Sequence, residues 1–84
     1  MKLAKYTKFR EEKFGGVLFE TASEKVFTLN PTAAAVVREI NAGVLDEPAL
    51  IERLKDHFHD PDGTIEREAR AFIADLRQKG LVEE

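Results

Sequence analysis

The run KVFTLNPT, residues 25–32, constrains the fold more than any other part of the chain. Its first five residues are rich in β-branched and aromatic side chains and favour a strand. Asn30 is a favoured helix N-cap, and Pro31 suits the first helical position, where its missing N–H is not needed. A strand must therefore end, and a helix begin, at Asn30.

Two β-rich runs surround a short loop and predict a hairpin. GVLFET (16–21) and KVFTL (25–29) are separated by only three residues. KYTKFREE (5–12) alternates more weakly and is predicted as a first strand, with Gly15-Gly16 as a turn or bulge after it. Apolar residues fall on both faces of the hairpin, so we expect something to cover part of its second face.

The helix that begins at Asn30 is predicted to run to residue 42, because Gly43 favours a helix end. A second helix is predicted to begin at Asp46 and to bury an apolar face. This face comprises Leu50, Ile51, Leu54 and Phe58.

A third helix is predicted after the break HDPDG (59–63), from about Thr64 to Gly80. Leu81-Val82 is expected to fold back onto the core. Three strands followed by three helices predict a winged-helix-like α+β domain with a three-stranded antiparallel sheet.

Length and composition favour one folded domain spanning residues 1–84. The chain is 43% hydrophobic and 35% charged and has no cysteine, which excludes disulfides and thiol chemistry. No run approaches the about 20 apolar residues of a transmembrane helix, and residues 1–13 lack the apolar core of a signal peptide. We therefore expect a cytoplasmic protein that makes no membrane contact.

The charge distribution argues against nucleic-acid binding. The net charge is −3, although residues 1–13 hold five basic and two acidic side chains. A winged-helix nucleic-acid-binding regulator is the alternative function, but its recognition helix would be the third one, where acids nearly balance bases. A basic first strand blunted against pairing explains the N-terminal charge. We expect no nucleic-acid partner.

The ionisable residues do not form a recognisable catalytic or metal site. His57 and His59 lie two residues apart and would diverge on a helix, whereas helical zinc ligands lie four apart. Residues 60–63 also fail as part of a calcium loop, because the bidentate glutamate would fall at Ala69. Ser23 has no histidine nearby in sequence. We expect no metal, no cofactor and no enzymatic activity.

Without a catalytic or metal site, a binding surface is the remaining candidate for the functional part of the chain. An unpaired edge of residues 25–29 would span ~17 Å and could receive an extended peptide, beside a groove supplied by a packed helix. An open edge also permits strand exchange between copies, so the chain is expected to be a monomer or a strand-exchanged dimer.

Three segments follow one another in an order and spacing typical of one family. They are REEKFGGVLFETASEKVFTLNPTAAAVV, EINAGVLDEPALIERLKDHF and IEREARAFIADLRQKGLV. The residues in register are Leu29, Asn30, Thr32, Ala33, Gly43, Leu50, Ile51, Leu54, Phe72, Leu76, Gly80 and Leu81. On these segments, residues 9–82 resemble the PqqD-like family, also called RiPP recognition elements. EKFGGVLFE is more similar to the mycofactocin-type members than to the pyrroloquinoline-quinone ones, and Ala42 stands where many members carry an acid.

The resemblance implies a function as a non-catalytic peptide chaperone. The leader of a ribosomally made precursor peptide would dock as an added strand on the third strand, beside the third helix. The protein would present it to a modifying enzyme, often a radical SAM protein. Carried over by position, the peptide-binding residues are Lys25, Val26, Phe27, Thr28, Leu29, Ala69, Phe72, Ile73 and Leu76.

Two details of this site stay open at the level of sequence. Phe72 and Leu76 lie on one side of the third helix and Ala69 and Ile73 on a neighbouring side, so one pair must fill the core. The pattern also leaves undecided which face of strand 25–29 looks toward the peptide.

Overall fold

The computed structural model describes residues 1–44 and 46–83 of the chain. The main antiparallel sheet has the strand order β2 (Thr7–Glu12), β3 (Gly15–Glu20) and β4 (Lys25–Leu29). Three helices follow it, α1 (Pro31–Asn41), α2 (Glu47–His57) and α3 (Thr64–Gln78). The predicted α+β order is confirmed. A second small sheet, β1 (Lys2–Leu3) with β5 (Val82–Glu83), has no counterpart in the sequence-based prediction.

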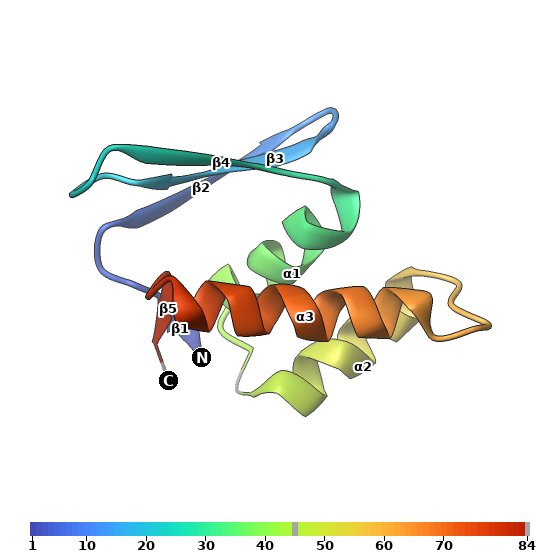
Figure 1. Ribbon diagram of the computed structural model, residues 1–84. Helices are drawn as coiled ribbons and strands as arrows, with labels where there is room; N and C mark the ends of the chain where they lie inside the picture. The colour runs from blue at the N-terminus through green and yellow to red at the C-terminus, as the bar shows by residue number, and fades with distance from the viewer. Residues whose placement is uncertain (45, 84) are drawn as a thin grey trace.

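The sheet forms one layer and the helices lie on one side of it (Figure 1). α1 descends from the end of β4 and packs against β3, α2 and α3. The two chain ends lie side by side below the C-terminal end of α3 (Figure 1), because β1 and β5 pair there. The sheet therefore has one face toward the helices, the inner face, and an opposite outer face.

Side-chain caps fix the helix starts that the sequence predicts. The Asn30 carboxamide oxygen accepts the N–H of Ala33 at 2.8 Å, and the Asp46 carboxylate accepts that of Ala49 at 2.9 Å. The HDPDG break also caps a helix, since the Asp60 carboxylate accepts from Ile65 at 2.9 Å. Each cap satisfies a backbone donor that the first helical turn leaves unpaired.

The two adjacent glycines do not form the first turn, which corrects the prediction from sequence. Lys13 and Phe14 make that turn, and Gly15 begins β3 with φ of 143°. A Cβ atom at Gly15 would lie only 2.1 Å from the carbonyl oxygen of Leu29. Glycine is needed here because β3 passes against the junction of β4 with α1.

The core lies between the inner face of the sheet and the three helices. Its large, fully buried side chains are Leu18, Val36, Val37, Ile40, Leu50, Ile51, Leu54, Ile73 and Leu76. Leu81 and Val82 are buried as well, so the expected return of the chain end to the core is confirmed. None of the described helices is long and apolar enough to cross a membrane.

Candidate peptide-binding edge and groove

β4 forms one edge of the main sheet. It pairs with β3 on one side, and no strand among residues 1–44 and 46–83 pairs with its other side. Unpaired backbone groups along a strand edge are ready to bond to another extended chain. β4 is also the strand that leads directly into α1, so its far end is fixed by the Asn30 cap.

The ladder shows which backbone groups of β4 point outward. The N–H of Thr21, just past β3, donates to the carbonyl of Tyr6 at 2.8 Å, so odd-numbered residues of β3 face β2. Because backbone groups alternate along an antiparallel strand, even-numbered residues of β3 face β4. Their partners by register are Lys25, Phe27 and Leu29. The N–H and C=O groups of Val26 and Thr28 therefore point outward.

The two faces of β4 lie in different surroundings. Leu29 is buried on the inner face and Phe27 is half-buried there, against the helices. Val26 lies on the outer face and is 59% exposed. All three helices lie on the inner side (Figure 1), so no described helix supplies the cover expected for the second face of the hairpin. Arg10 covers part of it instead, with its guanidinium 5.5 Å from the centre of the Phe19 ring.

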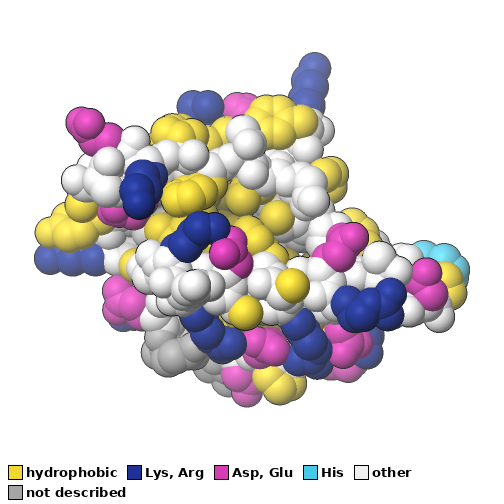
Figure 2. Space-filling model, in the orientation of Figure 1, with side chains coloured by type: hydrophobic (Ala, Val, Ile, Leu, Met, Phe, Trp, Pro, Cys, Tyr) yellow, Lys and Arg dark blue, Asp and Glu magenta, His cyan; other side chains and the backbone are white. Residues whose placement is uncertain are grey.

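A groove lies between β4 and α3, and we call it the β4–α3 groove. One part is a cavity of about 160 Å³ lined by Leu18, Phe27, Thr28, Leu29, Phe72, Asp75, Leu76, Lys79 and Leu81. A second part of about 250 Å³ is lined by Asn30, Thr32, Ala33, Glu68, Ala71 and Phe72. Phe72 belongs to both parts, so the groove follows β4 and continues past it to the start of α1. In Figure 2, hydrophobic side chains gather in the hollow between the sheet and α3, with charged side chains around it.

An ion pair at the rim of this groove lies next to its apolar lining. The Lys79 ammonium lies 2.5 Å from the Asp75 carboxylate and 5.5 Å from the centre of the Phe27 ring. A cation over an aromatic face is attracted by the ring quadrupole. Both side chains remain partly exposed, at 43% for Lys79 and 47% for Asp75. They can therefore move aside for, or contact, a chain that enters the groove.

The sequence pattern of the family described as coenzyme PQQ synthesis protein D (PqqD) matches residues 15–82. The chain belongs to the PqqD family. The match begins at β3 and ends in β5, so it includes β4, all three helices and the whole groove. No curated protein is similar enough in sequence to count as a match.

Two solved structures share the PqqD-family fold of this chain. One, "TbiB1 in Complex with the TbiA(beta) Leader Peptide", superposes with a TM-score of 0.81 at 19% identity, over 99% of this chain and 95% of that one. The other, "Lasso peptide synthetase B1 complexed with the leader peptide", gives 0.76 at 22% identity, over 99% and 96%. Both protein chains in these structures were solved with leader peptides.

The structure separates the residues that were predicted together on α3. Ala69 and Ile73 are 0% exposed and fill the core of the PqqD-family domain. Phe72 is half-buried and stands in the groove wall, while Leu76 is 1% exposed and forms part of the cavity floor. The packing does not divide the four residues into the two expected pairs: Ala69, Ile73 and Leu76 are all buried in the core, and only Phe72 is partly exposed. Contact of any of these residues with a peptide stays a prediction.

Sequence reasoning did not place Glu68 and Asp75 in the groove, and it interpreted Lys79 as a solvated charge on the helix surface. Asp75 and Lys79 follow Phe72 by three and seven residues, and Glu68 precedes it by four, so all four lie on one side of α3. That spacing was available in the sequence. It was overlooked because Asp75 and Lys79 also form an i,i+4 ion pair, which is equally typical of a solvated helix surface.

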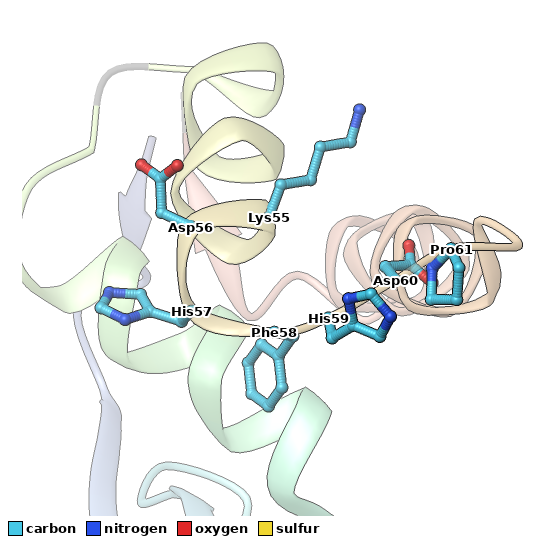
Figure 3. A pocket seen from close by; sticks show the side chains of 7 residues that line it. All are labelled: Lys55, Asp56, His57, Phe58, His59, Asp60 and Pro61. Carbon is cyan, nitrogen blue, oxygen red and sulfur yellow. The ribbon is translucent and has the colours of Figure 1, made fainter.

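Another hollow of the described residues lies away from the groove and does not resemble a binding site. It measures about 480 Å³ and is lined by residues 55–61, at the end of α2. Figure 3 shows that its side chains diverge, with His57 and His59 on opposite sides of the loop. Asp60 is used as a helix cap. In the described part of the chain, no three His, Asp or Glu side chains are placed to hold a metal ion.

Proposed function

We propose that this protein binds the leader of a ribosomally made precursor peptide as an added strand on β4 and presents it to a peptide-modifying enzyme. The observation that carries the proposal is the position of the outward-facing backbone groups of Val26 and Thr28 directly beside the β4–α3 groove. An extended peptide would bond to these groups, while its alternate side chains enter the groove. Addition of a strand to an exposed sheet edge is an established mode of peptide recognition.

Membership of the PqqD family and the two similar structures support this assignment. TbiB1 and lasso peptide synthetase B1 share the fold over nearly the whole chain, and both were solved with a leader peptide. The family match covers the strand and the helix that form the groove. The same class of ligand, an extended leader segment, suits the edge and groove of this chain.

The size and lining of the groove fit a peptide better than a small molecule. The two parts of the groove measure about 160 and 250 Å³, and each is smaller than the roughly 300–1,000 Å³ that a small-molecule site typically encloses. Its floor is formed by Leu18, Phe27 and Leu76, and charged groups stand only at the rim. One apolar side chain at a time fits such a pocket. Strand pairing plus a few such contacts is consistent with micromolar affinity, about −8 kcal/mol.

The protein acts in this proposal without catalysing a reaction. The ionisable residues of the groove, Glu68, Asp75 and Lys79, are surface groups, and Asp75 and Lys79 pair with each other. The chemistry then belongs to a partner, for which a radical SAM enzyme is the first candidate. Pull-down of that enzyme by the protein, with and without precursor, tests the handover step. An enzyme that is captured and activated equally well with a leaderless substrate would contradict it.

The nucleic-acid alternative gains no support from α3. Arg70 and Arg77 both bind the carboxylate of Glu47, at 2.7 and 2.9 Å, and Lys79 is paired with Asp75. Basic groups that neutralise phosphates would need to face outward together. These basic side chains of α3 instead join α3 to α2 or cover the groove.

The binding step is tested by an amide chemical-shift titration. The probe is a synthetic peptide that matches the N-terminal segment of a short precursor encoded beside this gene. We expect shifts at residues 25–29 and along the Phe72 side of α3, and a loss of affinity for Phe72→Ala. Phe14→Ala is the matched control, because Phe14 is 54% exposed in the β2–β3 turn. Saturable shifts elsewhere, or equal effects of both variants, would contradict the proposal.

A further inference from the structure

Val26 occupies an unusual position for an apolar side chain. It is 59% exposed, the largest exposed fraction among the large hydrophobic residues Tyr6, Phe14 and Val26. Single exposed apolar residues are common on protein surfaces and need no explanation. Val26, however, sits in the middle of the free edge, at the outward-pointing backbone groups, so a strand added there would lie beside it.

Apolar side chains on the outer face extend across the sheet as far as the β4 edge. Residues opposite one another across a sheet share a face, so Lys8, Phe19 and Val26 form one row across the three strands. Arg10, Val17 and Thr28 form the next row. Each row begins with a basic residue on β2 and becomes apolar or uncharged toward β4. The next place in each row is the position of an added strand.

At the β2 end of these rows, charged side chains cover part of the apolar surface. Arg10 lies over the Phe19 ring and pairs with Glu12 at 3.1 Å. Val17, which lies opposite Arg10 in the ladder, is only 7% exposed although no described helix lies above it. The β4 end lacks an equivalent cover among the described residues. The apolar surface is therefore open toward the edge on which the peptide is proposed to dock.

We propose that the outer face of the sheet also recognises the bound peptide, with Val26 as the specificity-determining residue. This inference rests on the proposed function and adds a second contact surface to it. The peptide residue opposite Phe27 points inward, to the cavity of the groove. The residue opposite Val26 points outward and packs on Val26 and the edge of Phe19.

The ligand class follows from this arrangement. The preferred peptide has two adjacent apolar side chains, one for the groove and one for Val26, because successive residues of a strand face opposite sides. On the far side of the inward residue, the position opposite Thr28 accepts a polar or β-branched side chain. A peptide with only alternating apolar residues would fill the groove and leave Val26 uncovered.

Peptide display tests this prediction with random sequences in place of a natural leader. A 15-residue library displayed on messenger RNA is selected against the wild-type protein, Val26→Thr and Phe72→Ala. We expect wild-type selections to enrich adjacent apolar pairs. Val26→Thr, which keeps the β-branched shape, should lose the outward preference and keep the inward one. Phe72→Ala should weaken the inward preference instead.

Affinity measurements make the same comparison on one selected peptide. Cross-strand pairs of this kind are each expected to change affinity by roughly two- to five-fold. Exchange of the outward peptide residue for Ser should lower affinity by that factor for the wild type and leave it unchanged for Val26→Thr. An equal loss for both proteins would overturn the role of Val26, even if the groove binds as proposed.

Two further outcomes separate this inference from the proposed function. Failure to enrich any peptide that shifts the amides of β4 would overturn both. Sedimentation of the free protein reports whether a second copy covers the edge. We expect a monomer, or a dimer that the peptide dissociates, while a dimer that persists with peptide bound would overturn the assignment of the outer face to the peptide.

Discussion

The two edge strands of the main sheet, β2 and β4, differ in charge and in what lies beside them. β2, TKFREE, carries two basic and two acidic residues, and its side chains form ion pairs between Arg10 and Glu12 and between Glu11 and Arg38. β4, KVFTL, has one charged residue, apolar side chains on both faces and a groove beside it. Charged residues on an edge strand discourage pairing with another chain. The same sheet thus protects one edge and leaves the other open.

The largest expected effect comes from a change that displaces the open edge itself. Gly15→Ala would place a Cβ atom 2.1 Å from the Leu29 carbonyl oxygen, at a backbone with φ of 143°. We expect a loss of about 3 kcal/mol in the free energy of unfolding. In thermal unfolding this corresponds to a Tm lower by roughly 10–20 °C.

Gly43→Ala is the matched control for this change. Gly43 also has a positive φ, 94°, but a Cβ atom there would have no neighbour within 4 Å. Only the backbone cost applies, about 1 kcal/mol, or a Tm lower by roughly 5 °C. Equal losses for the two variants would show that contact with the β4–α1 junction is unimportant.

Val26→Pro tests the difference between the edges most directly. The Val26 N–H points outward, so proline removes a donor to the peptide without breaking the β3–β4 ladder. We expect peptide affinity to fall by roughly five- to ten-fold, with Tm changed by only a few degrees. Fluorescence anisotropy and thermal unfolding measure the two quantities.

Glu11→Pro makes the same kind of change on the opposite edge. By the same alternation its N–H points away from β3, on the free side of β2. Affinity for the peptide should stay unchanged. Weaker binding by Glu11→Pro than by Val26→Pro would place the docking edge on β2.

Acid is expected to weaken the loop that holds β4 in register. The Ser23 hydroxyl, followed by the N–H groups of Ala22 and Ser23, donates to the Glu20 carboxylate and lowers its pKa. A lowered folded-state pKa contributes stability that is present above the unfolded-state pKa and is lost as pH falls through the folded-state value. The hydrogen bond from Lys55 lowers the pKa of Glu66 and adds to the same trend.

Urea unfolding between pH 3 and pH 7 measures this dependence. The stability of the wild type should fall with acidification, and Glu20→Gln should be less stable at pH 7 and less sensitive to pH. Glu24→Gln, in the same loop, serves as the control. A pH profile of Glu20→Gln that parallels the wild type would remove Glu20 from the explanation.

The smallest expected effect concerns the protected edge. Arg38 and Glu11 form an ion pair at 2.8 Å, but their side chains are 50% and 53% exposed. Exposed pairs contribute about 0.5 kcal/mol or less. Arg38→Ala should therefore change stability only slightly and leave peptide affinity unchanged. A clear loss of binding would mean that the β2 edge also takes part in recognition.

Local signals in the sequence predicted most of the fold. Asn30 and Asp46 mark helix starts because their side chains bond to backbone donors three residues away, which depends on nothing distant. The hairpin and its second strand followed from β-rich runs of suitable spacing, whereas the edge position of that strand was only assumed. The prediction for Gly15 was wrong because glycine is required there by the close approach of Leu29, fourteen residues later in the chain.

The groove was harder to predict because it depends on how α3 is rotated about its axis. A period of 3.6 residues places Ala69, Phe72, Ile73 and Leu76 on one broad face. Packing then turns Ala69 and Ile73 inward and leaves Phe72 at the surface. This rotation depends on packing against α1 and α2, which is not encoded in the α3 sequence alone.

The pairing of the chain ends has a consequence for linked enzymes. Lys2 lies opposite Glu83 and Leu3 opposite Val82, so both ends leave the domain from one place. A protein joined through a flexible linker to either end would therefore start from the same part of the domain surface. The effective concentration of that enzyme at a bound peptide depends on linker length and span. The position of the chain ends thus favours neither order of the two modules in such a fusion.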